Sequence, residues 1–294
     1  MRIAILAGWL ADRVLGDPAR FHPVAGFGRV ALALERRLWR QSRLAGVAHT
    51  AALVAGAAAL GASRRRAVRA AFVWAALGGR SLEAAALRLG AALDAGDVAA
   101  ARALAPTLVG RDPSQLDEVE LSRATVESVA ENTSDAVVAP LFWAAVGGAP
   151  AVAAYRAINT LDAMVGHKDE RYREFGWAAA RLDDLVNWPA ARLTALLAIG
   201  AAPLVGGSPS AAWRAAWDDG RRHPSPNAGR VEGAFAGALG VRLGGVNRYS
   251  HGLERRADLG AGPAPAIGDI SRAVTLARIV SAAALVVAVG LARR

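Results

Sequence analysis

The sequence predicts an all-α, polytopic integral membrane protein, and three observations support this fold class. Hydrophobic residues make up 54% of the 294 positions, and the mean hydropathy of +0.26 is high for a soluble domain. Several long windows contain no charged residue. Alternating strand patterns are missing, whereas helical spacing dominates residues 29–45, 80–105, 115–145 and 151–200. Composition alone leaves one alternative, an Ala-rich soluble helical protein.

The first apolar stretch, residues 3–11 after Arg2, is similar to the core of a signal peptide. No small-residue cleavage site follows it, and Asp12-Arg13 interrupts it. We therefore expect this stretch to belong to the mature protein, where it is too short to span a bilayer.

Four longer apolar segments are candidates for membrane spans, because a helix needs about 20 mostly apolar residues to cross the hydrocarbon core. Residues 44–63, 136–155 and 193–213 contain no Asp, Glu, Lys or Arg. The fourth segment, 279–292, lengthens to 274–292 if Arg278 snorkels or faces the protein interior. We expect a single membrane-embedded domain over 1–294 in a cytoplasmic membrane.

Two of these segments contain a helix-breaking pattern, VGGAP at 146–150 and VGGSP at 205–209. Broken helices occur at membrane depth where they are buried in protein or line a cavity. If both segments crossed the bilayer fully, the polar blocks around them would alternate between its two sides. We therefore expect at least one re-entrant segment, which would leave the polar blocks on one, cytoplasmic, face.

Charge and cysteine content exclude several classes of site. The chain has no cysteine, so neither disulfides nor thiolate chemistry is available. Its net charge is +10, but the basic residues are spread along the chain without interleaved aromatics, which argues against nucleic-acid binding. Arg-rich blocks beside apolar segments fit a membrane surface.

A row of carboxylates leads into the second apolar segment. Arg123, Glu127, Glu131 and Asp135 step by four, so they lie along one helix face, with Asn132 beside them. Like charges at this spacing repel and call for a counter-charge, either Arg123 on a solvated face or a cation such as Mg²⁺. No His follows either Glu at the spacing of a di-iron site, so that site is excluded.

The block that follows, 155–193, is rich in oxygen ligands at helical spacing. Two pairs are one turn apart and one pair is four apart: Asn159 with Asp162, Arg181 with Asp184, and Asp183 with Asn187. Asp and Asn suit Mg²⁺, for which one or two carboxylates suffice when phosphates supply the other ligands. Lys168, the one lysine in the chain, is either a phosphate ligand or a solvated loop residue.

Further polar islands flank the apolar segments. They contain Asp17 and His22, Arg111 and Asp112, and His223, Asn227 and Glu232, each beside Pro or Gly. Turn chemistry explains each island singly. After the last island, the small residues of 228–240 suit close helix packing. Motifs of P-loop, Rossmann, nucleophile-elbow and zinc-protease sites do not occur in the sequence.

Taken together, the islands resemble the membrane cobinamide synthases of cobalamin biosynthesis, also called adenosylcobinamide-phosphate synthases. The resemblance covers nearly the whole chain except the apolar segments. It rests on GDPARFHPV, LVGRDPSQLD, RATVESVAENTSDAVVAPLF, YRAINTLDAMVGHKDERYREFGWAAARLDDLVNWPAARLTALL and HPSPNAGRVEGAFAGALGVRLGG. Members often have serine at the position of Ala163 and a small residue such as glycine at Ala136.

The resemblance implies an amide ligase that joins (adenosyl)cobyric acid to 1-aminopropan-2-ol or its phosphate. Amide formation in water needs an activated acyl group, so ATP and Mg²⁺ are implied as cofactors, with an acyl phosphate as the simplest intermediate. On this hypothesis Mg²⁺ is held by carboxylates, namely Glu127, Glu131, Asp135, Asp183 and Asp184. Phosphates are held by Arg111, Lys168 and Arg181, the acyl and amine groups are oriented by Asn132, Asn187 and Asn227, and a carboxylate or His223 takes the amine proton. Asp17, His22, Asp112, Asn159 and Asp162 are expected to bind substrate.

The competing class is an ion-coupled transporter or a membrane scaffold, since broken helices with carboxylates at the membrane edge also describe carriers. A carrier places its polar residues in mid-span, whereas here they lie just outside the apolar segments. The expected partners are the corrinoid, the aminopropanol, the lipid bilayer and other late enzymes of the pathway. The sequence leaves two questions undecided: whether the protein forms a homo-oligomer, and whether the amine is free or phosphorylated.

Overall fold

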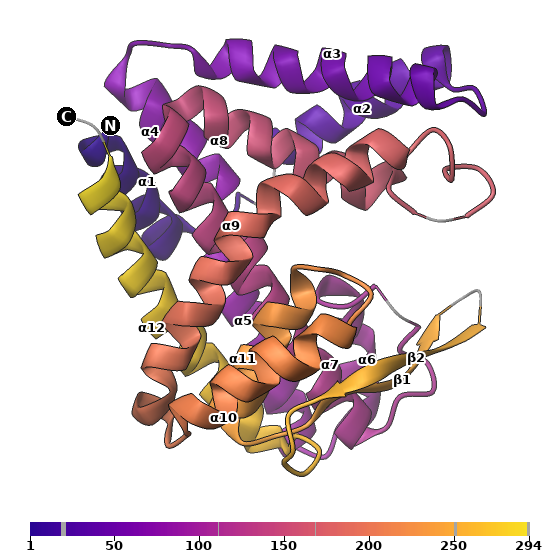
Figure 1. Ribbon diagram of the computed structural model, residues 1–294, viewed down its shortest axis with the longest axis vertical. Coiled ribbons are helices and arrows are strands. Elements are labelled where there is room, and N and C mark those ends of the chain that lie inside the picture. The colour runs from indigo at the N-terminus through magenta and orange to yellow at the C-terminus, as the bar shows by residue number, and fades with distance from the viewer. Residues whose placement is uncertain (19–21, 111, 168, 250–251, 293–294) are drawn as a thin grey trace. The chain divides into compact units, whose positions relative to one another are not determined.

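The protein is mostly helical, as predicted, with one small β-hairpin (Figure 1). A computed structural model describes residues 1–18, 22–110, 112–167, 169–249 and 252–292. The longer helices are α1 (Arg2–Leu15), α2 (Pro23–Leu38), α3 (Arg43–Gly61), α4 (Arg66–Ala76), α5 (Gly79–Asp94), α7 (Glu118–Thr133), α8 (Ala139–Val165), α9 (Trp177–Ala201), α11 (Ala228–Leu239) and α12 (Ile267–Leu291).

Shorter elements connect these helices. They are α6 (Val98–Leu104), α10 (Pro209–Arg214), the 3₁₀ turns η1 (Ala105–Thr107), η3 (Ala202–Val205) and η5 (Gly220–Arg222), and the π-turns η2 (Ser134–Val138) and η4 (Ala215–Asp219). The hairpin pairs β1 (Leu243–Tyr249) with β2 (Gly252–Leu259).

The chain divides into two compact units, and the expected single membrane-embedded domain stays a prediction. Unit 1 contains Met1–Gly78, Asp135–Trp188 and Ala284–Arg294, and unit 2 contains Gly79–Ser134 and Pro189–Ala283. Each unit is therefore built from segments that lie far apart in the sequence.

Among the described residues, four helical stretches are long and apolar enough to cross a membrane: Arg43–Gly61, Glu118–Val165, Trp177–Val205 and Ile267–Leu291. Each overlaps one of the four predicted segments, which confirms the multi-pass helical class. The third stretch begins at Trp177 and ends at Val205, whereas the charge-free segment is 193–213. The fourth extends through Arg278, whose Nε donates to Glu83 at 2.8 Å, so this arginine is paired within unit 2.

Both predicted helix breaks are present. Within α8, Gly148 has φ 72° and ψ −160°, a conformation open essentially to glycine, and Pro150 follows it. The second break is at Gly206, where φ is 77°, and α10 begins at Pro209. Within the region 151–200, where helical spacing dominates, α8 ends at Val165 and α9 begins at Trp177.

In unit 1, α3 packs closely on α8 because small residues lie at the contact. A Cβ at Gly46 would clash with the carbonyl of Phe175, and one at Gly61 would lie 2.6 Å from the carbonyl oxygen of Ala149. The two ends of the described chain also meet in this unit, since Arg2 Nε donates to the carbonyl of Ala292 at 3.1 Å.

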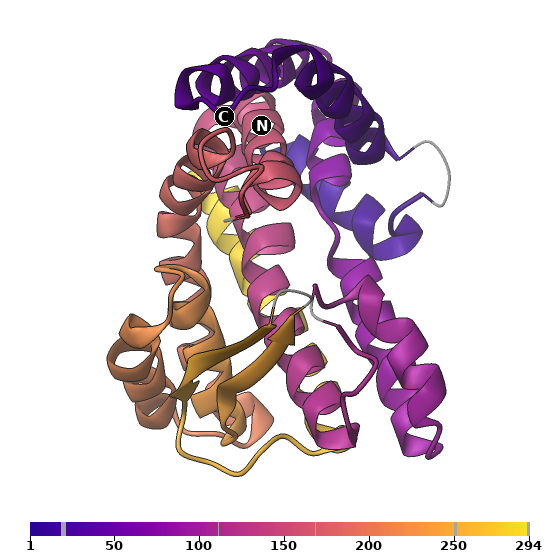
Figure 2. The same cartoon turned by 90° about the vertical axis from the view of Figure 1, so that its right-hand side faces the viewer.

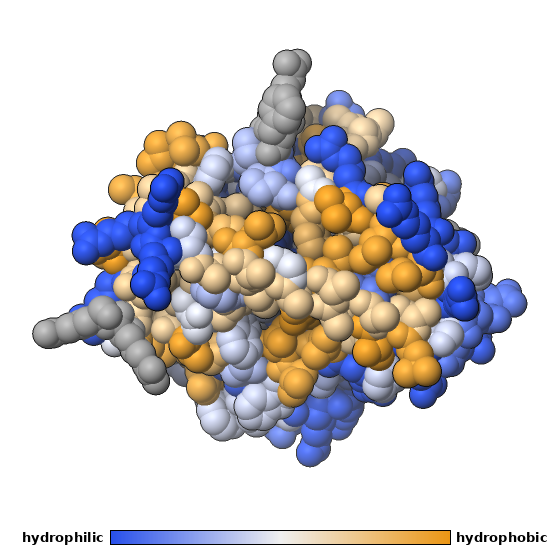
Figure 3. Space-filling model, turned by 90° about the horizontal axis from the view of Figure 1, so that it is seen from above, coloured by the Kyte–Doolittle hydropathy of each residue, from blue (hydrophilic) through white to orange (hydrophobic). Residues whose placement is uncertain are grey.

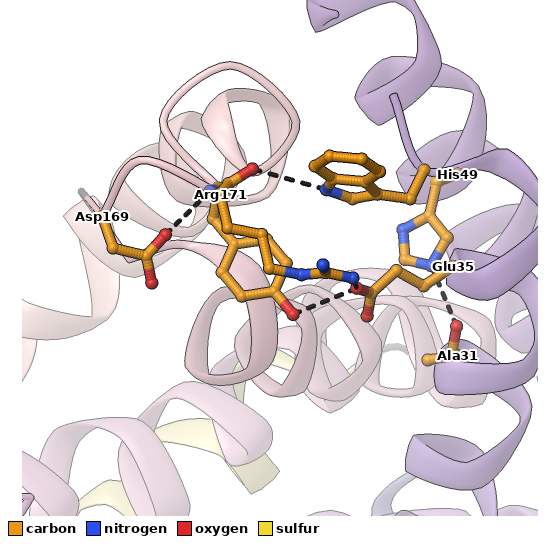
Figure 4. A network of polar contacts seen from close by, with 7 residues as sticks. Ala31, Glu35, His49, Asp169 and Arg171 are labelled. Atoms are coloured by element: carbon orange, nitrogen blue, oxygen red, sulfur yellow. Dashed lines mark hydrogen bonds and ion pairs between the residues drawn. The ribbon is translucent and has the colours of Figure 1, made fainter. Parts of the chain in front are cut away.

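The segment after α8 is anchored to α2 by a buried carboxylate (Figure 4). Oε1 of Glu35, a residue that is 3% exposed, accepts from Nη2 of Arg171 and from Oη of Tyr172, each at 3.0 Å. The guanidinium of Arg171 also lies 4.6 Å from the ring centre of Trp39. The hydrogen bond to Glu35 raises the pKa of Arg171 above its ordinary value, so the guanidinium stays charged.

In unit 2, α11 packs against α10 and η4, as expected of its small residues. A side chain at Gly233 would clash with the carbonyl of Ala215, and one at Gly237 with the backbone of Ala212. The hairpin, which contacts α11 (Figures 1 and 2), was not predicted, because its strands carry no alternating pattern. Its pairing is irregular between Leu243 and Gly245.

Candidate functional site

The predicted polar residues that come together most closely lie in unit 1, where α8 and α9 meet. Asn159 Nδ2 donates to Oδ1 of Asp183 at 3.3 Å. The hydroxyl of Tyr155 lies 2.9 Å from Oδ1 of Asn187 and 2.8 Å from the backbone oxygen of Asp135. These five residues come from two predicted blocks, the carboxylate row that ends at Asp135 and the block 155–193, and Asn187 lies close to Asp183. We call them the α8–α9 polar cluster.

Helix geometry explains this convergence. Tyr155 and Asn159 are four positions apart on α8, and Asp183 and Asn187 are four apart on α9, so each pair occupies one helix face. Asp135 lies in the π-turn η2, an irregularity that is frequent at functional sites. Tyr155 and Asn187 are buried, so the packing around their side chains restricts the geometry of their hydrogen bond.

Further carboxylates surround the cluster. Asp162 and Asp184 both lie close enough to Asp183 to repel its charge. Asp184 also pairs with Arg181 at 3.9 Å, with side chains 41% and 69% exposed, so this is a weak surface ion pair. A cation or a cationic substrate group at this place would relieve the repulsion among the three carboxylates.

The predicted pair Asp17 and His22 is formed in unit 1. His22 Nε2 lies 3.3 Å from Oδ1 of Asp17, while its Nδ1 accepts from the backbone N–H of Val24 at 3.1 Å and caps α2. A Cβ at Gly78 would lie 3.8 Å from Oδ2 of Asp17 and 3.6 Å from Cβ of Ala136. Asp17 is therefore close to the π-turn that carries Asp135.

The other predicted residues belong to unit 2, where several have structural partners. Oε1 of the buried Glu127 accepts from the backbone N–H of Gly244 at 2.8 Å and lies 3.8 Å from Nη1 of Arg123. This carboxylate therefore stabilises the start of the hairpin. Asn132 Nδ2 donates to the carbonyl of Ser128 at 2.9 Å, and Glu131 lies on the exposed side of α7.

Near the start of α11, the side chains of His223 and Asn227 are also engaged. His223 Nδ1 accepts from the backbone N–H of Ser225 at 3.1 Å, and Arg192 Nη1 donates to Oδ1 of Asn227 at 2.8 Å. At the entry to α7, Asp112 Oδ1 accepts from Ser114 N–H at 2.9 Å, as its turn chemistry predicts. Arg111 and Lys168 lie outside the described residues.

Among the described residues, no group of three or more His, Asp or Glu side chains is arranged to hold a metal ion. The five predicted magnesium ligands fall into the two units, with Glu127 and Glu131 in unit 2 and the three aspartates in unit 1. Asp183, with its neighbours Asp162 and Asp184, meets the need of Mg²⁺ for one or two carboxylates when phosphates complete the shell. The magnesium assignment stays a prediction.

Sequence reasoning missed three residues of these networks: Tyr155, Arg156 and Arg192. Arg156 Nη1 donates to Oδ1 of Asn159 at 3.3 Å, and Arg192 holds Asn227. Tyr155 ends an apolar segment and looks like part of the core. Its position four residues before Asn159 was the available signal, because it places the phenol on the polar face of α8.

The fold and this cluster define a multi-pass helical membrane protein with a polar site built from carboxylates and amides on its apolar helices. The family model for the CobD/Cbib proteins matches residues 5–277, so the chain belongs to the CobD/Cbib family. The Cobalamin biosynthesis protein CobD of Mycobacterium tuberculosis is 53% identical over 99% of this chain and 96% of its own length.

Relatives from more distant bacteria carry the same name. The proteins of Geobacter metallireducens and Klebsiella pneumoniae are 47% and 39% identical, over 83% and 98% of this chain and 82% and 96% of their own lengths. No solved structure matches the chain. The family assignment confirms the resemblance seen in the sequence and places the chain in cobalamin biosynthesis.

Proposed function

We propose that the protein is the ligase that joins the carboxylate of (adenosyl)cobyric acid to 1-aminopropan-2-ol or its O-phosphate, forming an amide. The observation that carries the proposal is the α8–α9 polar cluster, which links Asp135, Tyr155, Asn159, Asp183 and Asn187. Membership of a cobalamin biosynthesis family supports the choice of a corrinoid substrate.

The cluster offers the groups that this reaction needs. The carboxylate of Asp183, held by Asn159, is placed to attract the ammonium of the amine and to accept its proton. The buried amide of Asn187 lies beside Asp183, where it favours the charged form of this carboxylate. Asp162 and Asp184 add negative charge at the same place.

ATP with Mg²⁺ would supply the phosphoryl group that activates the acyl carbon. The residues that would hold the metal in unit 1 are Asp183, Asp184 and Asp135, and Arg181 would contact a phosphate. Arg181 is 69% exposed and its pairing with Asp184 is weak, so its guanidinium can exchange partners. We also propose the cytoplasmic membrane as the location, because the nucleotide and the corrinoid precursors are made in the cytoplasm.

The test is synthesis by purified protein. Protein in detergent or nanodiscs is incubated with adenosylcobyric acid, Mg-ATP and either aminopropanol or its phosphate, and the corrinoid is analysed by mass spectrometry. The expected product carries the mass of the added amine less one water. No product with either amine, from protein that is folded and monodisperse, would overturn the proposal.

One observation keeps a carrier as the second candidate. The polar cluster lies on α8 and α9, both within stretches long and apolar enough to span a membrane, and carriers place polar groups at such positions. Proteoliposomes separate the two functions, because a carrier moves cobyric acid or an amine across the bilayer without ATP or amide formation.

A further inference from the structure

An open groove of about 800 Å³ lies in unit 1 between α2, α3, α4 and α8. Its size is in the range of ligand pockets in proteins. Its walls are formed almost wholly by Ala, Val, Leu, Phe and Gly side chains. Among the described residues that line it, Arg156 is the one charged side chain and none is a carboxylate.

The rim of the groove is apolar as well. Val30 on α2 and Leu60 on α3 are 59% and 73% exposed. The view onto α3 in Figure 3 shows an extended apolar surface with hydrophilic patches at its edges. Because α3 and α8 are both candidate membrane spans, we infer that this rim faces lipid.

Arg156 provides a polar group in the groove, and not all of its N–H donors are hydrogen-bonded within the described residues. Its Nη1 makes one long hydrogen bond to Asn159 at 3.3 Å, and its Nε is buried without a partner among the described residues. In the described part of the lining, the other polar residue is Thr160, whose hydroxyl donates to the backbone oxygen of Arg156. A guanidinium in apolar surroundings favours an anion, and phosphate matches its geometry.

We propose that this groove binds one anionic phospholipid, with its phosphate at Arg156 and its acyl chains between α2, α3 and α4. The apolar walls match acyl chains, and the single cation matches the charge of the headgroup. A corrinoid is a poor match, because its amide side chains need polar partners and the walls offer only Arg156 and Thr160. The proposal stands independently of the ligase activity.

The site would also connect the membrane to the polar cluster. Arg156 donates to Asn159, and Asn159 donates to Asp183. A phosphate bound to the guanidinium would therefore fix the position of Arg156, the first residue in this series of hydrogen bonds. Lipid composition would thereby influence the order of the α8–α9 polar cluster.

The chain offers a matched pair of variants for the test. Gly56 lines the groove, and a Cβ built there meets no atom within 4 Å, so Gly56→Leu fills the groove without a clash. Gly290 on α12 also meets no atom within 4 Å and does not line the groove, so Gly290→Leu is the control. Both changes replace glycine by a better helix former in an apolar helix.

Native mass spectrometry of protein titrated with phosphatidylglycerol or phosphatidylcholine measures binding. We expect one bound phosphatidylglycerol per wild-type chain, with an affinity about tenfold lower in Gly56→Leu, where the apolar space is filled, and unchanged in Gly290→Leu. Arg156→Gln should abolish the preference, about tenfold, for phosphatidylglycerol over phosphatidylcholine. Equal retention by Gly56→Leu and wild type, or no preference in the wild type, would overturn the proposal.

Wild-type protein alone provides a second measurement if the variants fail to fold. Phosphatidylglycerol with a photoactivatable acyl chain should label peptides from 52–60 and 72–76, and unlabelled phosphatidylglycerol should compete. Inorganic phosphate should not compete. Labelling spread evenly over α12 and α3 would contradict a discrete site, and displacement by cobyric acid would reassign the groove to the substrate.

Discussion

The hydroxyl of Tyr155 donates a hydrogen bond to Oδ1 of Asn187 at 2.9 Å, across 32 positions of the chain. The backbone oxygen of Asp135 lies 2.8 Å from the same hydroxyl. A phenol has one proton, so it bonds one of these acceptors at a time. The hydroxyl therefore joins α8 to α9 when it bonds Asn187, and to the π-turn when it bonds Asp135. The bond to Asn187 holds that amide beside Asp183.

Replacing this phenol by phenylalanine should therefore loosen the cluster. Tyr155→Phe leaves Asn187 and the carbonyl of Asp135 without their buried donor, and we expect a loss of about 1–3 kcal/mol in the free energy of unfolding. Denaturation in detergent measures this loss. In a double-mutant cycle with Asn187→Ala, the coupling should be about 0.5–3 kcal/mol, and additive effects would show that the bond carries no energy.

Asp183 is the carboxylate on which the proposed chemistry depends. Asp183→Asn keeps the size and most hydrogen bonds of the side chain but removes the charge, so we expect amide synthesis to fall by about 10²-fold or more, as for loss of a general base. The mass-spectrometric assay measures the rate. The control is Asp94→Asn, at an exposed position on α5. Wild-type rates in Asp183→Asn would remove this residue from the mechanism.

The break in α8 depends on a backbone conformation that only glycine adopts readily. At Gly148, with φ 72° and ψ −160°, a Cβ is strained, so Gly148→Ala should lower the unfolding free energy by about 1–3 kcal/mol. Gly200→Ala in α9 is the comparison, since a Cβ there meets no atom within 4 Å and alanine favours the helix. Thermal unfolding should separate the two variants, and equal melting temperatures would argue against the break.

Glu35 should control the order of the segment 169–176. Glu35→Ala removes the acceptor of both Arg171 and Tyr172, and we expect trypsin to cleave after Arg171 or Arg173 at least about tenfold faster, as for loss of a charged hydrogen bond. Glu174→Ala is the matched control, because its ion pair with Arg43 is exposed. Unchanged cleavage in Glu35→Ala would show that other contacts anchor the segment.

The helical framework could be predicted because its signals are local. The absence of charge over some 20 residues marks the apolar segments, and Gly-Gly followed by Pro marks both breaks. The hairpin could not be predicted in this way. In its first strand, the N–H of Gly244 donates to Glu127, a residue 117 positions earlier.

The same distinction applies to the site. Asn159, Asp183 and Asn187 are visible as polar residues at helical spacing, and the structure joins them. For Glu127, the spacing offered Arg123 as one of two counter-charges, and the structure places Arg123 beside it, but the distant backbone amide of Gly244 is not visible in the sequence. The role of a carboxylate can depend on a partner that is remote in the sequence, and the spacing of residues along one helix does not identify such a partner.

The contact between Arg2 and the carbonyl of Ala292 has a consequence for membrane orientation. Two groups 3.1 Å apart lie on the same side of the bilayer. The number of complete crossings between them must therefore be even, whatever the path of each broken helix. For the four candidate stretches of the described residues, we therefore expect an even total number of complete crossings. Reporter domains fused next to Arg2 and after Ala292 should accordingly be found in the same compartment.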